Sequence, residues 1–182
     1  ESEESLVKLC DALENNESYE NIQALCYKKD GRIIVGQPEY IADVDSLSMP
    51  AWHLLPMEKY SSIIGLHPTS TMMGSRGCPY LCGFCYKTPS DKKYRTRSVE
   101  KIVDEMEYLI ENFGLKEIMF YDDLMPQKYA KALSEEIIKR NVKIRWQTPQ
   151  RVNLVNPELL QLMAKAGCRV LRFGFEQGDP DQ

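Results

Sequence analysis

The sequence predicts an α/β fold in which about four strand–helix units form part of a parallel (β/α) barrel. A small helix–hairpin and an extended linker precede these units. The first observation is that three strand patterns begin at residues 117, 143 and 169, a constant step of 26 residues. The second is that a helix pattern fills each interval, and such alternation implies parallel strands joined by right-handed crossovers. An open doubly wound sheet fits the same pattern.

The N-terminal part of the chain predicts a helix followed by a hairpin. Residues 4–14 place their apolar side chains on one face of a helix. Two short strand patterns, 22–27 and 32–35, flank Asp30-Gly31, which is a favoured hairpin turn. Residues 36–59 contain prolines at 38, 50 and 56 and have no sustained period, so they predict an extended linker. We divide the chain into a helix–hairpin segment (1–36), a linker (37–67) and an α/β core (68–182).

The elements of the core follow in order along the chain. A strand at 69–75 leads into a cysteine-rich loop. A helix is expected at 98–113, with Ser98 as its N-cap and Gly114 just after its end. A second helix is expected at 127–140, and a third begins at Asn156, has Pro157 in its first turn and ends before Gly167. The later strands are expected at 117–121, 143–147 and 169–175.

Polar residues follow each predicted strand of the core. Ligands of parallel α/β folds bind at the carboxyl ends of the strands. The residues at these positions are unusual for a core: Arg76-Gly77-Cys78, Asp122-Asp123, Thr148 to Arg151, and Glu176-Gln177. We therefore expect one rim of the sheet to form the binding site.

The strongest chemical signal is a loop with three cysteines. Cys78, Cys82 and Cys85 lie within eight residues. Thiolates so close in sequence can converge on one metal centre. Three of them can hold three irons of a 4Fe–4S cluster and leave the fourth iron open, whereas ordinary electron-transfer clusters use four cysteines. An open coordination position is typical of a catalytic rather than a structural metal site.

A zinc site, a redox-active cysteine pair and an electron-transfer cluster are the competing interpretations of this loop. Zinc prefers four ligands, and the loop offers three cysteines and no histidine. The histidines of the chain, His53 and His67, lie upstream of the loop. An electron-transfer cluster needs a fourth cysteine, and Cys168 is expected at the opposite end of the sheet from the loop. For Cys168, Cys10 and Cys26 we expect burial as small side chains.

The loop resembles the three-cysteine signature of the radical S-adenosylmethionine (SAM) superfamily, including an aromatic residue, Phe84, immediately before the last cysteine. In that family the open iron binds the amino and carboxylate groups of SAM. One electron from the cluster then breaks a carbon–sulfur bond, which gives methionine and a 5′-deoxyadenosyl radical that abstracts hydrogen from the substrate. The resemblance therefore implies an enzyme with a 4Fe–4S cluster and SAM, in which the protein binds, orients and shields its cofactors.

Further segments are similar to the subgroup that places a cobalamin-binding domain before the radical SAM core. They are Pro50-Ala51-Trp52, Leu54-Leu55-Pro56, Ser75 to Pro79, Asp122-Asp123 and Phe173 to Glu176. The resemblance implies that residues 1–36 close a cobalamin domain and that residues 68–182 begin a six-unit partial barrel of radical SAM type. We expect a fragment that binds no cobalamin alone, with cobalamin a candidate cofactor of the full-length protein.

The same resemblance implies which residues contact the cofactors. Cys78, Cys82 and Cys85 would bind the cluster, and the expected SAM-binding set is Phe84, Tyr86, Asp122, Asp123, Gln147, Arg151 and Glu176. The aromatic residues would lie beside the adenine, and one of the aspartates would accept hydrogen bonds from the SAM amino group or the substrate. Arg151 would pair with the SAM carboxylate and Glu176 with the ribose hydroxyls. Plain packing of the aromatic residues and surface positions for the charged ones stay open.

Several reactions fit this subgroup. Hydrogen abstraction, methyl transfer and cyclisation or rearrangement of an organic substrate are all implied by the resemblance, and no catalytic side chain is assigned. A methylthiotransferase is the nearest alternative enzyme. Resemblance to that family would require an N-terminal domain with three cysteines, and only Cys10 and Cys26 precede the loop.

Composition limits the class of partner. The chain has 182 residues, of which 43% are hydrophobic, and a net charge of −4, so it has no general attraction for nucleic acid. No apolar run approaches the roughly 18 residues of a membrane span. The first residues are unlike a signal peptide. We expect a cytoplasmic enzyme with an organic substrate and an electron donor such as a ferredoxin or flavodoxin.

Overall fold

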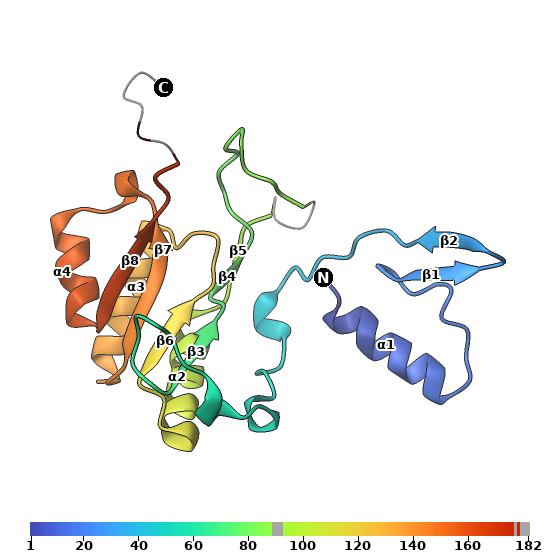
Figure 1. Ribbon diagram of the computed structural model, residues 1–182, viewed down its shortest axis with the longest axis horizontal. Helices are drawn as coiled ribbons and strands as arrows, with labels where there is room; N and C mark the ends of the chain where they lie inside the picture. The colour runs from blue at the N-terminus through green and yellow to red at the C-terminus, as the bar shows by residue number, and fades with distance from the viewer. Residues whose placement is uncertain (89–92, 177, 179–182) are drawn as a thin grey trace. The chain divides into compact units, whose positions relative to one another are not determined.

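The computed structural model describes residues 1–88, 93–176 and 178 (Figure 1). Contacts divide the chain into two compact units. The N-terminal unit comprises residues 1–42 and 79–93, and the core unit comprises residues 43–78 and 94–182. No helix in the described part of the chain has the length and apolar character needed to cross a membrane.

The N-terminal unit contains one helix and one hairpin. Helix α1 (Glu3–Glu14) is followed by the antiparallel strands β1 (Cys26–Lys29) and β2 (Arg32–Val35). The turn residues Asp30 and Gly31 have φ angles of 48° and 77°, and a type I′ turn requires positive φ at both positions. The predicted helix and hairpin are present. Strand β1 begins at Cys26 rather than at residue 22, because Ala24 has a φ of 58° that interrupts extended backbone.

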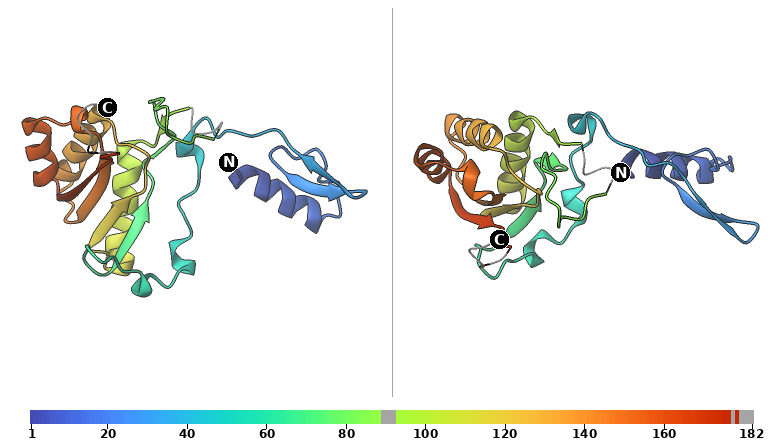
Figure 2. Two further views of the ribbon diagram at one scale, coloured as in Figure 1. Left: turned by 45° about the horizontal axis from the view of Figure 1, so that its top comes forward. Right: turned by 90° about the horizontal axis from the view of Figure 1, so that it is seen from above.

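The core unit is built on a sheet of four parallel strands. Their order is β3 (Thr69–Met72), β6 (Glu117–Phe120), β7 (Arg145–Gln150) and β8 (Cys168–Phe173). Figure 2 shows that helices α2 (Val99–Phe113), α3 (Gln127–Lys139) and α4 (Pro157–Lys165) lie together on one face of this sheet. The predicted α/β fold, with parallel strands in chain order and one helix in each connection, is confirmed.

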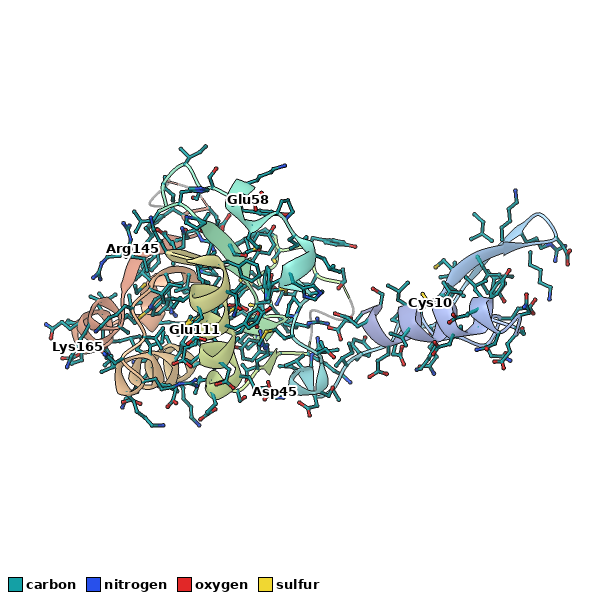
Figure 3. All side chains as sticks on the ribbon, turned by 90° about the horizontal axis from the view of Figure 1, so that it is seen from below. Cys10, Asp45, Glu58, Glu111, Arg145 and Lys165 are labelled. Carbon is teal, nitrogen blue, oxygen red and sulfur yellow. The ribbon has the colours of Figure 1, made fainter. Side chains whose placement is uncertain are left out.

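The helix ends follow the residues that the sequence offers. Gly114 ends α2 with a φ of 62°, and the side chain of Asn156 begins α4 by accepting the Leu159 amide at 2.8 Å. Ser98 stands at the N-cap of α2 as expected, but its side chain makes no capping bond. Both carboxylate oxygens of Asp45, which is labelled in Figure 3, instead accept the Ser98 amide at 3.0 Å. The first turn of α2 is therefore capped from the linker.

The first predicted strand is interrupted. Strand β3 ends at Met72, and after a turn the chain enters β4 (Ser75–Arg76), which pairs antiparallel with β5 (Arg95–Thr96). The interruption has a tertiary cause, because the amides of Gly74 and Ser75 donate to the carboxylate of Asp122 rather than to a neighbouring strand. The cysteine loop therefore leaves the core unit from a short two-stranded ribbon.

The hydrophobic core lies between the sheet and its helices. Ile118 and Phe120 of β6 and Trp146 of β7 are completely buried there. The rings of Phe120 and Trp146 meet edge to face with centroids 5.9 Å apart, and the Trp146 indole donates to the Ala166 carbonyl at 2.9 Å. Side chains alternate along a strand, so Glu117, Met119 and Gln147 lie on the opposite face. The polar side chains of Glu117 and Gln147 thus lie on the face away from the helices.

Part of the predicted linker packs on the core unit. Residues 43–59 form three short 3-10 helices, η1 (Val44–Ser46), η2 (Trp52–Leu54) and η3 (Met57–Lys59). The side chains of Trp52 and Met57 are buried in the hydrophobic core. The Trp52 indole donates to the buried carboxylate of Glu105 on α2 at 2.9 Å. This half of the linker is therefore tied to the core by packing and by a buried hydrogen bond.

Replacing Gly167 with alanine is expected to destabilise the core unit strongly. Gly167 has a φ of +96°, and a Cβ atom there would lie 2.2 Å from the Ile144 carbonyl oxygen. We expect a loss of about 3 kcal/mol or more in the free energy of unfolding, measured by chemical denaturation. Gly114 is the matched control, because it has a φ of +62° but open space around the Cβ position, so Gly114→Ala should lose only about 1 kcal/mol. Equal losses would contradict this account.

Candidate active site

The cysteine loop begins immediately after β4. Gly77 is buried with a φ of 78°, a backbone conformation that favours glycine, and Cys78 follows it. Cys78 is half-buried and belongs to the core unit, whereas Cys82 and Cys85 belong to the N-terminal unit. Within that unit the Cys85 amide donates to the Cys82 carbonyl at 3.1 Å, so these two cysteines share a tight turn.

The donor set fits an iron–sulfur cluster with one open iron. Three thiols in one short loop are the ligands that such a cluster requires. Among the described residues, no three Cys, His, Asp or Glu side chains are gathered closely enough to hold a metal ion. Metal binding itself supplies free energy that draws ligands together. Convergence of the three thiolates therefore stays a prediction, based on their spacing and their chemistry.

Asp122 lies two residues after the end of β6 and binds the turn that leads to the loop. Its side chain is buried, with the residue only 8% exposed. One oxygen, Oδ1, accepts the amides of Gly74 at 3.0 Å and Ser75 at 2.6 Å, and also the Ser75 hydroxyl at 2.9 Å. The neighbouring Asp123 is exposed. Of the two adjacent aspartates, Asp122 is therefore the one that points inward.

The surroundings of Asp122 form a buried polar cluster. Burial raises the pKa of Asp122 to about 6, although the hydrogen bonds from Ser75 and Gly74 act in the opposite direction. Its second oxygen, Oδ2, is buried and has no hydrogen-bond partner in the described part of the chain. Burial also raises the pKa of Tyr94 to about 12 and raises that of Tyr129 above its ordinary value. Both phenols therefore stay protonated at neutral pH.

The raised pKa of Asp122 predicts a stability difference that depends on pH. Its pKa in the folded protein, about 6, exceeds the ordinary value of 3.8, so folding favours the protonated acid. The contribution of protonated Asp122 to the free energy of unfolding is largest below about pH 4 and is lost as the pH rises through 6. Asp122→Asn removes the titration, so between pH 4 and 7 the variant should gain about 2.5 kcal/mol relative to the wild type. Urea denaturation at several pH values measures this difference, and a difference that is constant with pH would contradict the buried titration.

Three of the predicted site residues lie where the strands end. Asp123 follows β6, Arg151 follows β7 and is half-buried, and Glu176 follows β8 and is exposed. The Glu176 carboxylate turns back over Gly174, where an added Cβ would lie 2.5 Å from its Oε1. Gln177 lies outside the described residues. The three charged side chains thus follow neighbouring parallel strands at their carboxyl ends, as the sequence predicts.

The other predicted residues lie elsewhere. Strand β7 extends to Gln150, so Gln147 lies inside the strand, where it is completely buried. Its Nε2 donates at 3.1 Å to Oε1 of Glu117, which begins β6, so Gln147 faces away from the rim. Phe84 and Tyr86 belong to the N-terminal unit and are 72% and 88% exposed. Their side chains are open to a ligand.

The structure adds residues that the sequence did not single out. Arg97 donates its amide to the Gly74 carbonyl at 2.9 Å and its guanidinium to the Met73 carbonyl at 3.3 Å. The Tyr129 hydroxyl donates to the Gly74 carbonyl at 3.2 Å. Arg172 of β8 donates to the Phe120 carbonyl at the end of β6. The charge of Arg172 within an apolar strand pattern could have marked it as a candidate site residue. Nothing in the sequence marks Arg97 or Tyr129 in this way.

A parallel α/β sheet with a three-cysteine loop after its first strand defines the class of protein. The sequence matches the radical SAM superfamily over residues 72–181. This match covers more than half of the chain, and the protein therefore belongs to the radical SAM superfamily.

Similar proteins include enzymes of this superfamily that differ in their named reactions. An uncharacterised methyltransferase of Pyrococcus horikoshii is 35% identical over 99% of this chain and 40% of its own length. The anaerobic magnesium-protoporphyrin IX monomethyl ester cyclase of Rubrivivax gelatinosus is 32% identical over 81% of this chain and 27% of its own length. The chain thus spans less than half the length of these relatives.

A solved structure has the same fold. The radical SAM methyltransferase TsrM of Kitasatospora setae, with cobalamin and a 4Fe–4S cluster bound, superposes with a TM-score of 0.73. The match covers 98% of this chain and 37% of that protein, at 20% sequence identity. This likeness supports the predicted type of partial barrel.

Proposed function

We propose that the protein is a radical SAM enzyme in which Cys78, Cys82 and Cys85 bind a 4Fe–4S cluster. The main support is the three-cysteine loop, which follows the first parallel strand in a chain of this superfamily. When bound, such a cluster supplies an open iron for SAM and the electron that breaks a carbon–sulfur bond. The product radical serves hydrogen abstraction, methyl transfer or cyclisation of an organic substrate. The electron comes from a donor of the ferredoxin or flavodoxin class.

We infer that the charged residues at the rim, Asp123, Arg151 and Glu176, bind SAM. The groups of SAM to be recognised are an amino group, a carboxylate and ribose hydroxyls. Carboxylates accept hydrogen bonds from amino and hydroxyl groups, and a guanidinium can donate two parallel bonds to a carboxylate. We assign Arg151 to the SAM carboxylate, Glu176 to the ribose and Asp123 to the amino group or the substrate. Asp122 is less suited, because its Oδ1 already accepts three hydrogen bonds.

The exposed aromatic residues of the loop are assigned to the adenine. Phe84 and Tyr86 flank Cys85 and present their rings to solvent. An aromatic ring can stack on an adenine and exclude water from it. Both residues would then shield the nucleoside next to the cluster.

We propose cobalamin as a further cofactor of the whole enzyme. The support is the resemblance of residues 1–36 and of the linker to the cobalamin-associated subgroup. The relatives named above as a methyltransferase and a cyclase have sequence beyond the matched region. Methyl transfer and cyclisation are accordingly the two reaction types that we place first.

The test is the fate of SAM with reconstituted protein. The protein is loaded with iron and sulfide without oxygen, reduced with dithionite and incubated with SAM. We expect methionine and 5′-deoxyadenosine to form together, measured by mass spectrometry. A protein that holds a complete cluster and leaves SAM intact would contradict the proposal and favour an electron-transfer role.

A further inference from the structure

The turn Met73–Gly74–Ser75 is held on its amide side by a single oxygen atom. Oδ1 of Asp122 accepts both amides of Gly74 and Ser75 and the hydroxyl of Ser75, at 2.6–3.0 Å. Hydrogen bonds to a charged acceptor are shorter and stronger than neutral ones. The two amides converge on this acceptor because the backbone turns there, so the carboxylate stabilises that particular turn.

The same turn is held on its carbonyl side by two further residues. The Gly74 carbonyl accepts the Arg97 amide at 2.9 Å and the Tyr129 hydroxyl at 3.2 Å, and the Met73 carbonyl accepts the Arg97 guanidinium at 3.3 Å. Arg97 is itself fixed by an ion pair of 2.6 Å with Glu105, which is buried on α2. A Cβ on Gly74 would lie 3.1 Å from the Tyr129 hydroxyl oxygen, so the backbone approaches that side chain closely.

The fixed backbone continues almost to the first cysteine. Ser75 and Arg76 pair with Thr96 and Arg95 across β4 and β5. Only Gly77, buried and in the left-handed region, separates this ribbon from Cys78. The direction in which Cys78 leaves the core unit is therefore set by the turn and the ribbon.

We propose that Asp122 and Arg97 clamp the turn from its two sides and thereby position Cys78 as a cluster ligand. The proposal rests on the proposed function, because it takes Cys78 to be a ligand. Asp122 is then a positioning residue that acts through the backbone, rather than a residue that contacts SAM. The clamp explains why one of two adjacent aspartates is buried while the other is exposed.

The clamp is tested first in the protein without its cluster, by hydrogen–deuterium exchange read out by mass spectrometry over residues 73–77. In Asp122→Ala the amides of Gly74 and Ser75 should exchange about 10- to 100-fold faster than in the wild type. Asp122→Asn should fall in between, because its amide oxygen still accepts. Asp123→Ala, the same change at the adjacent exposed position, should leave this exchange unchanged.

The positioning role is tested next by loading each variant with iron and sulfide in the absence of SAM. Asp122→Ala should hold less than about half of the wild-type iron, since its turn is released, and Asp123→Ala should hold as much as the wild type. If Asp122→Ala does not fold, Tyr129→Phe removes one bond to the Gly74 carbonyl and keeps the ring. Tyr129→Phe should speed the exchange of the turn amides severalfold, and it should also lower the amount of iron that the protein holds.

Three results would overturn the proposal. Unchanged exchange in Asp122→Ala would show that the carboxylate does not hold the turn. Faster exchange with full iron loading and an unchanged electron paramagnetic resonance signal would show that the turn does not position Cys78. Wild-type protein that takes up no iron, while Asp122 still protects the turn, would refute the proposed function and with it the positioning role, leaving only a structural clamp.

Discussion

Replacing Cys82 with alanine is expected to abolish iron loading and the cleavage of SAM. A cluster held by three cysteines has no spare ligand, so loss of one thiolate removes a third of the ligands that the protein supplies to the iron. Reconstituted wild-type protein should hold about four irons per chain, and Cys82→Ala less than about one. SAM cleavage should fall on the order of a hundredfold or more. Iron analysis and product assays measure both effects.

Cys10→Ala is the matched control for this experiment. Cys10 lies on α1, outside the loop. It is exposed, as is Cys26, so the expected burial of these two cysteines is wrong, whereas Cys168 is buried. Its replacement should leave iron content and SAM cleavage at the wild-type level. Full iron content in Cys82→Ala, or an equal loss in Cys10→Ala, would exclude the three-cysteine site as we describe it.

Replacing Glu105 with alanine is expected to cause the largest loss of stability among the charged residues discussed. Glu105 is 1% exposed and accepts the Trp52 indole at 2.9 Å, and it pairs with Arg97 at 2.6 Å. Its removal takes away the carboxylate partner of the Arg97 cation and the acceptor of the Trp52 indole N–H. Breaking a buried pair in this way costs about 3–5 kcal/mol. Urea denaturation of the protein without its cluster measures the free energy of unfolding.

Glu107→Ala separates this effect from the general cost of removing a glutamate from α2. Glu107 pairs with Arg140 near the surface, with side-chain exposures of 35% and 25%. Such a pair contributes less than about 1 kcal/mol. Similar losses for the two variants would mean that the buried network of Trp52, Glu105 and Arg97 does not hold the linker to the core.

The order of the core elements could be predicted because local signals agree with the global fold. The apolar face of 98–113, the stop at Gly114 and the steady step between strands each favour the same parallel unit. The residue at which a strand ends is harder to predict from sequence, since it depends on pairing with the neighbouring strands. Strand β7 continues to Gln150 alongside β8, and this moved Gln147 from the expected rim into the sheet.

The clamp on the cysteine loop could not be predicted from the sequence. Asp122 and Ser75 are 47 positions apart, and Tyr129 and Gly74 are 55 apart, so no local pattern links them. Asp122 and Asp123 are also chemically identical in sequence, and only the packing after β6 distinguishes the buried carboxylate from the exposed one. By contrast, the spacing of the three cysteines is a local signal, and it carried the prediction of the cluster.

The most direct test of the central claim is electron paramagnetic resonance of the reconstituted, reduced protein with and without SAM. We predict the signal of a reduced 4Fe–4S cluster and a change in its g-values when SAM is added, because SAM binds the open iron. A cluster signal that is unchanged by SAM would contradict an open, SAM-binding iron. Stoichiometric zinc with no iron would contradict the cluster itself.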